Sequence, residues 1–201
     1  MLDTLIHKNL GLLRYRSTHE NITFSTLGPE GTSSEFATKK LIDYLDIESH
    51  YELYPSYEQA AESIVQGNAD FLVVANAYQN INKFYINNEL DFFFCFLQNT
   101  LPYGIAISEK TFYPSKPALL IASHPAPAHL IELLPKKYRS KTKIIYSSST
   151  SQAAHQVKIG EVDLCITNQS SAEINELKFI SRLQTIEMLW TIFKSKTNND
   201  Y

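Results

Sequence analysis

An internal repeat is the sequence feature that most constrains the fold of this chain. The segment AAESIVQGNADFLV at residues 60–73 recurs as AAHQVKIGEVDLCI at residues 153–166, with two alanines, one glycine and one aspartate at a constant offset of 93 residues. Each copy predicts a helix that ends at the glycine, a short turn and a buried strand. Two similarly built units predict a bilobal α/β architecture, with a cleft between the lobes where ligands prefer to bind.

The rest of the chain also alternates between apolar runs typical of strands and patterns typical of helices. The expected strands are at 22–27, 50–54, 70–75, 91–97, 102–107, 117–122, 143–147, 162–167, 178–183 and 187–193. The expected helices are at 33–44, 57–66, 127–134, 150–159 and 169–175. This alternation predicts βαβ units and mostly parallel sheets.

Composition and charge exclude several classes of function. The chain has 201 residues, a net charge of −3 and a pI near 6.1, and its basic residues are scattered, so we expect no nucleic-acid partner. Cys95 and Cys165 lie in apolar runs and are expected to be buried thiols, not a disulfide or metal ligands. Charges among the N-terminal leucines argue against a secretory signal, and the longest apolar run, at 92–97, is too short to span a membrane. A soluble cytoplasmic protein is therefore the expectation.

A glycine-rich turn separates the first predicted strand from the first predicted helix. Gly28-Pro29 and Gly31 favour a turn, because glycine accepts positive φ and proline fixes its own φ. Thr32 and Glu35 then form a capping box that opens the helix. Such a helix start aims backbone N–H groups and a positive dipole end at an anion. An ordinary helix start is the alternative, and the residues alone leave both interpretations open.

Two more polar segments follow predicted strands. Residues 147–151 (SSSTS) precede the helix of the second repeat and offer hydroxyl and backbone N–H groups, although an ordinary N-cap explains them equally well. Ser123-His124-Pro125 ends another strand, where a single histidine is more often a capping or surface residue than a catalyst. We find no metal-ligand spacing, no Walker or dinucleotide fingerprint and no Ser-His-Asp order in the sequence.

The segment Leu27–Ala37 (LGPEGTSSEFA) resembles the opening signature of prephenate dehydratase catalytic domains. From Thr26 onward it is most similar to the prephenate decarboxylases of antibiotic and natural-product pathways, a branch of the same family. The resemblance extends to about Phe193 and so covers nearly the whole chain.

This resemblance implies a type-II periplasmic-binding-protein-like fold for a domain at 21–201. Lobe 1 is expected at about 21–100 plus 183–195, and lobe 2 at about 101–182. Residues 1–20 have no counterpart in the family, and their leucines predict a short amphipathic helix as an N-terminal extension.

The same resemblance implies the site residues, because the Ser-His-Pro and Ser-Thr-Ser-x-Ala-Ala segments match motifs of the family. Those implied to act in catalysis are His124, Thr32 and Tyr78. Those implied to bind the substrate are Ser33, Asn76, Ser149, Thr150, Ser151, Met188 and Trp190. Without the resemblance, Tyr78 is typical of a packed aromatic side chain, and Met188 and Trp190 of a core strand.

Two departures from the dehydratase pattern bear on the reaction. Ala77 and Tyr78 stand where dehydratases carry the Glu-Asn of Pro-x-Glu-Asn-Ser, and the decarboxylase branch also carries Ala-Tyr there. Met188-Leu189-Trp190 stands where dehydratases carry Thr-Arg-Phe, whose threonine is thought to help the ring hydroxyl leave. The resemblance therefore implies loss of carbon dioxide from prephenate with the hydroxyl retained, giving a dihydro-4-hydroxyphenylpyruvate without a cofactor.

Two alternatives remain open at this point. One is a divergent prephenate dehydratase that makes phenylpyruvate, and the other is a non-catalytic module of the same bilobal type that binds a small carboxylate. The proton donor is not identified. Glu35 is the one formal candidate, but a role in the capping box explains its presence better than a role in proton transfer. The resemblance also implies a homodimer and a pathway to a dihydrotyrosine-derived antibiotic or nonribosomal peptide.

Overall fold

A computed structural model describes residues 21–46 and 48–196, so the predicted extension at 1–20 lies outside the described residues. The described chain divides into two compact units. The first holds the residues up to Gly28, then Ser34–Gln98 and the residues from Glu187 onward, and the second holds Pro29–Ser33 and Asn99–Ile186. The chain therefore passes between the units more than once, and the turn at Pro29–Ser33 belongs to the second unit, although its sequence neighbours belong to the first.

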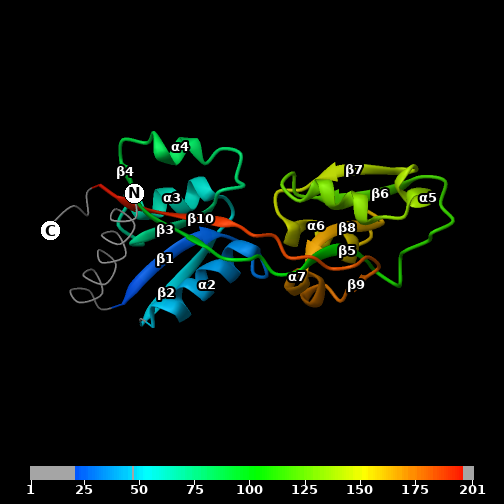
Figure 1. The fold of residues 1–201 in the computed structure, drawn as a ribbon, viewed down its shortest axis with the longest axis horizontal. Coiled ribbons are helices and arrows are strands. Elements are labelled where there is room, and N and C mark those ends of the chain that lie inside the picture. Colours follow the sequence, from blue (N-terminus) through cyan, green and yellow to red (C-terminus); the bar gives the residue numbers. More distant parts are fainter. Residues whose placement is uncertain (1–20, 47, 197–201) are drawn as a thin grey trace. The chain divides into compact units, whose positions relative to one another are not determined.

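A five-stranded sheet with the order β2-β1-β3-β10-β4 forms the centre of the first unit (Figure 1). Strand β1 is parallel to β2 and β3, whereas β10 is antiparallel to both β3 and β4. The strands are β1 (Ile22–Leu27), β2 (Ser49–Tyr54), β3 (Phe71–Ala75), β4 (Leu90–Leu97) and β10 (Leu189–Ser195). The helices are α2 (Ser33–Leu45), α3 (Tyr57–Val65) and α4 (Asn82–Tyr85).

The second unit contains a sheet with the order β7-β6-β8-β5-β9. Strand β6 is parallel to β7 and β8, whereas β5 is antiparallel to β8 and β9. The strands are β5 (Tyr103–Ile107), β6 (Leu119–Ser123), β7 (Thr142–Tyr146), β8 (Leu164–Asn168) and β9 (Lys178–Phe179). The helices are the 3-10 helix η1 (Ala128–Leu133), α5 (Lys136–Arg139), α6 (Thr150–Lys158) and α7 (Gln169–Ile174).

The prediction of mostly parallel sheets is wrong, because each sheet has as many antiparallel as parallel strand pairings. The antiparallel strands β5 and β10 each follow a passage of the chain from one unit to the other, so no crossover helix imposes a parallel direction on them. Two short helices, α4 and α5, were not expected. The helix expected at 127–134 is a 3-10 helix, and the strand expected at 178–183 shortens to two residues.

The two sheets repeat each other in strand order and direction, and the repeat found in the sequence extends to helix ends. Helix α3 is capped by Ser56, whose Oγ accepts a hydrogen bond from the Gln59 N–H, and α6 is capped in the same way by Ser149 and Gln152. Both pairs are 93 residues apart. The predicted similarity of the two units is therefore confirmed at the level of single hydrogen bonds.

The repeated aspartate has the same structural role in both units. In the first unit Asp70 Oδ2 accepts the N–H of Thr23 at 2.8 Å, which joins the start of β3 to β1. In the second unit Asp163 Oδ2 accepts the N–H of Leu120 at 2.9 Å, and its other oxygen accepts the Lys116 ammonium. Each carboxylate therefore fixes the register of two parallel strands where they begin.

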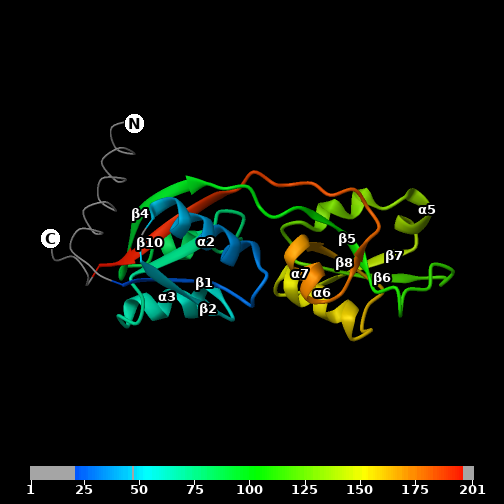
Figure 2. The ribbon, with the colours of Figure 1, turned by 90° about the horizontal axis from the view of Figure 1, so that it is seen from below.

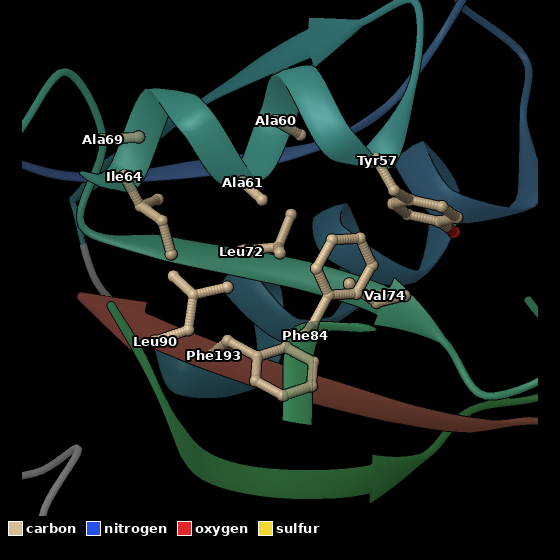
Figure 3. Close-up of a cluster of buried hydrophobic side chains, with 10 residues drawn as sticks. All are labelled: Tyr57, Ala60, Ala61, Ile64, Ala69, Leu72, Val74, Phe84, Leu90 and Phe193. Carbon is tan, nitrogen blue, oxygen red and sulfur yellow. The ribbon is translucent and has the colours of Figure 1, made fainter. Parts of the chain in front are cut away.

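The hydrophobic core of each unit lies on both faces of its sheet. In the first unit Ala60, Ala61 and Ile64 of α3 pack on one face against Leu72, and Phe193 and Phe84 extend this cluster (Figure 3). A second cluster on the other face includes Ala37 and Leu41 of α2.

The second sheet is covered in the same manner. Figure 2 shows α6 and α5 on opposite sides of it, and separate clusters of buried side chains include residues of α6 and of η1. Helices on both faces leave the ends of the parallel strands as the place where polar side chains gather. Among the described residues, no helix combines the length and apolar character needed to cross a bilayer.

Candidate functional site

In each unit, parallel strands end at one edge of the sheet, and a capped helix begins near that edge. In the first unit β1 ends at Leu27 and β3 at Ala75, and in the second unit β6 ends at Ser123 and β8 at Asn168. Open α/β sheets bind ligands beyond these carboxyl ends. The predicted residues Asn76 and His124 each directly follow one of these strand ends.

The glycine-rich turn is fastened within the second unit through the carbonyl oxygen of Gly31. That oxygen accepts hydrogen bonds from Asn168 Nδ2 and Ser171 Oγ, both at 2.9 Å. Asn168 also caps α7, because its Oδ1 accepts the Ser171 N–H at 2.8 Å. Sequence analysis missed Asn168 and Ser171. A polar Asn-x-x-Ser pattern at the end of a buried strand is the signal that would have identified the cap, but not its contact with Gly31.

Hydroxyl groups surround this turn, and their hydrogen bonds determine which of them still has a proton to donate. Ser171 Oγ donates to the Gly31 carbonyl, so in the 2.7 Å contact between Ser151 and Ser171 the proton comes from Ser151. Ser33 Oγ lies 2.7 Å from the Tyr103 hydroxyl, where either group can donate. Sequence analysis missed Tyr103, which is separated from Ser33 by 70 positions.

The start of α6 has donors that remain available. Ser149 Oγ accepts the N–H of Gln152 at 3.0 Å, and its own proton has no acceptor among the described residues. The same is true of the Thr150 hydroxyl and of the backbone N–H groups of Thr150 and Ser151 in the described part of the chain. A carboxylate placed at this helix start would receive hydrogen bonds and the favourable end of the helix dipole. Thr32, the residue before α2, is buried.

His124 follows β6, and its ring is fixed by one hydrogen bond. Its Nδ1 accepts the N–H of Ala126 at 3.2 Å, so in the neutral ring the proton lies on Nε2. Burial lowers the pKa of His124 below the ordinary value of 6.5. At neutral pH the ring is therefore an uncharged hydrogen-bond donor through Nε2.

Two of the predicted residues lie in the first unit, just after β3. Asn76 Oδ1 accepts a hydrogen bond from Thr191 Oγ1 at 2.8 Å. The Tyr78 hydroxyl donates to Glu58 Oε1 at 2.7 Å, and its ring packs between Tyr57 and Phe84. Burial, and then the Glu58 hydrogen bond, raise the pKa of Tyr78 above 10, so the phenol stays protonated and its proton points at Glu58.

The remaining predicted residues of the first unit are largely structural in their contacts. Trp190 is 1% exposed within the core, and its indole N–H donates to the Gln98 carbonyl at 3.0 Å. Met188 is partly buried against the same cluster. Glu35 forms an ion pair with Lys39 at 2.7 Å and accepts the Tyr51 hydroxyl, which accounts for its place in α2.

No group of three or more His, Cys, Asp or Glu residues among those described has the arrangement of a metal site. Both cysteines are free. Cys165 is fully buried as predicted, and burial raises its pKa. Cys95 was also predicted to be buried, but it is partly exposed, because it lies on β4 at the edge of its sheet.

The sequence matches, over residues 24–193, the family model described as prephenate dehydratase. The chain belongs to the prephenate dehydratase family. It is 34% identical over 184 residues to the prephenate decarboxylase of Planktothrix agardhii, covering 88% of this chain and 90% of that protein. It is 33% identical over 186 residues to the prephenate decarboxylase of Bacillus subtilis strain 168, covering 90% of each chain. The predicted family is therefore confirmed.

Solved structures agree on the fold of this family member. A prephenate dehydratase from Arthrobacter aurescens, in complex with L-Phe, matches with a TM-score of 0.67 at 14% sequence identity. The match covers 87% of this chain and 60% of that protein. A periplasmic substrate-binding protein of an ABC transporter from Coxiella burnetii matches with a TM-score of 0.54 at 18% identity, covering 89% of this chain and 87% of that one. The predicted two-lobe α/β fold, like that of periplasmic binding proteins, is confirmed.

Replacing Gly31 tests how tightly the turn is held. Gly31 has φ +83°, and a Cβ there would lie 2.9 Å from Ile174 Cδ1, whereas Gly67 has φ +76° with nothing within 4 Å. We expect Gly67→Ala to lower the free energy of unfolding by about 1 kcal/mol through backbone strain alone. Gly31→Ala should cost about 0.5 kcal/mol more, because the half-exposed Ile174 side chain must rotate away and Ser171 Oγ, 3.3 Å from the added Cβ, must shift slightly. Urea unfolding measures both, and adding Ile174→Val should recover part of the difference. Equal losses at both glycines would contradict this account.

The lowered pKa of His124 predicts a specific pH dependence of stability. The unfolded state takes up the proton first as the pH falls, so the stability contributed by neutral His124 is complete above about 6.5 and declines toward the lower folded pKa. We expect wild type to lose more stability than His124→Asn between about pH 7.5 and about pH 5, because asparagine keeps an acceptor for Ala126 but does not titrate. Urea unfolding across that range measures the difference, and parallel profiles would refute it.

Proposed function

We propose that this protein is a prephenate decarboxylase that leaves the ring non-aromatic. The observation that carries the proposal is about one-third sequence identity, over nearly the full length of both chains, to proteins with that name. Membership of the prephenate dehydratase family supports a reaction on the same substrate. No cofactor is part of the proposal.

The reaction follows from the structure of prephenate. Its ring carboxylate is attached to a quaternary carbon between two double bonds, and a hydroxyl lies across the ring. When the carbon–carbon bond to the carboxylate breaks, carbon dioxide leaves and the electron pair moves into the diene. A proton then adds to a ring carbon, and the hydroxyl stays. If an acid protonated the hydroxyl instead, water would leave and the ring would become aromatic, giving phenylpyruvate.

The absence of the Thr-Arg pair of dehydratases favours loss of carbon dioxide with the hydroxyl retained. The residues aligned with the Thr-Arg of dehydratases are Met188 and Leu189, which can neither donate a proton nor bind the departing hydroxyl. Trp190 of the same segment is buried in the core, so we leave it out of the proposed site. An apolar surrounding also disfavours a charged carboxylate relative to neutral carbon dioxide.

We assign roles to the other predicted residues by the donors they have available. In the second unit, Ser149 and Thr150 at the start of α6 bind one carboxylate of the dianion, and His124 donates from Nε2 to the substrate. The other candidates of that unit, Thr32, Ser33 and Ser151, shape the hydroxyl-rich surroundings of the turn. In the first unit, Asn76 binds the substrate through Nδ2, and Tyr78 and Met188 contact the ring.

The decisive test of the proposed reaction is to incubate the protein with prephenate and identify the products by NMR. We expect carbon dioxide and a species that retains its carbinol proton and its non-aromatic ring signals. Phenylpyruvate as the sole product would make the protein a dehydratase. Binding of prephenate without its consumption would make it a binding module.

The repeated N-cap provides a matched pair of variants for the proposed anion site. Ser56→Ala and Ser149→Ala remove the same cap from α3 and α6, so each should lower the free energy of unfolding by about 1 kcal/mol. Only Ser149→Ala should also raise KM for prephenate, by about tenfold, because it removes a donor to a carboxylate. Steady-state kinetics at saturating and limiting prephenate measure this. Equal KM values for the two variants would exclude Ser149 from the site.

Other parts of the proposal rest on the resemblance to the decarboxylase branch alone. These are a homodimer and a product that enters the biosynthesis of a dihydrotyrosine-derived antibiotic or nonribosomal peptide. The proposed cytoplasmic location rests instead on the charges among the N-terminal leucines and on the short apolar runs.

A further inference from the structure

Three side chains of the first unit form a chain of hydrogen bonds that ends at Asn76. The Tyr85 hydroxyl lies 2.9 Å from Thr191 Oγ1, and Thr191 Oγ1 lies 2.8 Å from Asn76 Oδ1. Thr191 is fully buried in β10, opposite Val74 of β3, whereas Tyr85 ends α4 and is 46% exposed. Three separate elements, α4, β10 and the end of β3, therefore meet at one row of polar groups.

Simple chemistry determines the direction of every proton in this row. A carboxamide oxygen only accepts, so the single Thr191 hydroxyl proton must be donated to Asn76 Oδ1. The Tyr85 hydroxyl must then be the donor to Thr191 Oγ1. Hydrogen bonds arranged in one direction polarise each other, which makes the N–H groups of the terminal amide better donors.

The surroundings hold both ends of the row in place. The Tyr85 ring packs edge-on against Phe193 with centroids 5.0 Å apart. The backbone N–H of Asn76 donates to the Leu189 carbonyl at 3.0 Å, so its main chain is tied to β10 as well. With Oδ1 held by Thr191, the Asn76 Nδ2 group faces away from Thr191, and it donates no hydrogen bond to any described residue. It is a fixed two-proton donor at the carboxyl end of the central strand of its sheet.

We propose that Thr191 and Tyr85 are positioning residues that aim the Asn76 amide at a carboxylate oxygen of the substrate. This inference rests on the proposed function, since it names prephenate as the ligand of Asn76. An amide that binds the same oxygen throughout the reaction stabilises substrate and transition state alike, so its loss changes KM and not kcat. Neither Thr191 nor Tyr85 touches the substrate in this proposal.

Substitution of Thr191 tests the inference. Thr191→Val keeps the branched shape that suits a strand but removes the hydroxyl, and we expect KM for prephenate to rise about tenfold with kcat within about twofold of wild type. Thr191→Ser keeps the hydroxyl and should remain within about twofold of wild type in both constants. If the serine variant loses as much as the valine variant, the hydroxyl is not responsible and the inference fails.

A combination with Asn76→Ala distinguishes positioning from general stability. Because Thr191 acts through Asn76, Thr191→Val should have no further effect on KM in the Asn76→Ala background. Tyr85→Phe should raise KM about threefold alone and should add nothing to Thr191→Val. Additive effects on KM in either cycle, or a KM of Thr191→Val that does not change while its melting temperature falls, would overturn the inference.

Calorimetric binding of prephenate separates this inference from the proposed reaction. If wild type binds prephenate without consuming it, the proposed reaction fails, and a tenfold higher Kd for Thr191→Val would still support the inference. If wild type turns prephenate over but Thr191→Val binds and reacts like wild type, the reaction stands and the inference fails. If wild type neither binds nor consumes prephenate, both are wrong.

Discussion

The parallel pairing of β1 with β3, and of β6 with β8, determines where polar side chains able to bind a ligand or take part in a reaction lie in this protein. Both strands of each pair are buried, with helices or aromatic clusters over their faces. Polar side chains inside them, such as Ser25 and Thr26 of β1, donate their hydroxyl protons to backbone carbonyls and have none left for a ligand. An aspartate fixes each pair where it begins, and both strands of a pair then end at the same edge. Asn76 and His124, which the resemblance implied as site residues, are each the first residue after such a strand.

Hydroxyl groups that look equivalent in the sequence are not equivalent in the structure. Ser149 and Ser151 are two residues apart in one motif, yet Ser149 accepts a backbone N–H and keeps its proton, whereas Ser151 donates its proton to Ser171. The difference arises because Ser171 donates its hydroxyl proton to the Gly31 carbonyl and can then only accept a hydrogen bond from Ser151. Acceptors therefore decide which serines can bind an anion, and residue type alone does not.

Local patterns carried most of what the sequence predicted correctly. A cap and a helix-ending glycine each act within a few residues, so the repeat and most of the element order were visible without a structure. The bonds of Asp70 and Asp163 to a neighbouring strand, across 47 and 43 positions, were not predicted. The family motifs added the candidate residues themselves. The antiparallel direction of β5 and β10 could not be predicted from the sequence, because the residues of a strand do not determine which strand it pairs with.

Contacts between distant segments were also beyond the sequence. Asn168 reaches Gly31 across 137 positions, and Tyr85 reaches Thr191 across 106. Each involves a common polar residue with no distinguishing neighbours, so only the folded arrangement reveals the pair. The burial of Trp190, by contrast, was predicted from its own segment, because without the resemblance that segment is typical of a core strand.

The placement of the two cysteines has a practical consequence for studying how this protein unfolds. Each unit contains one thiol in its sheet, fully enclosed at Cys165 and partly accessible at Cys95. A thiolate must form and meet its reagent before alkylation can proceed, so an enclosed thiol with a raised pKa reacts only after its own sheet has opened. Labelling of Cys165 followed by mass spectrometry can therefore time the opening of the second sheet, and the partly accessible Cys95 serves as an internal control that the reagent is active.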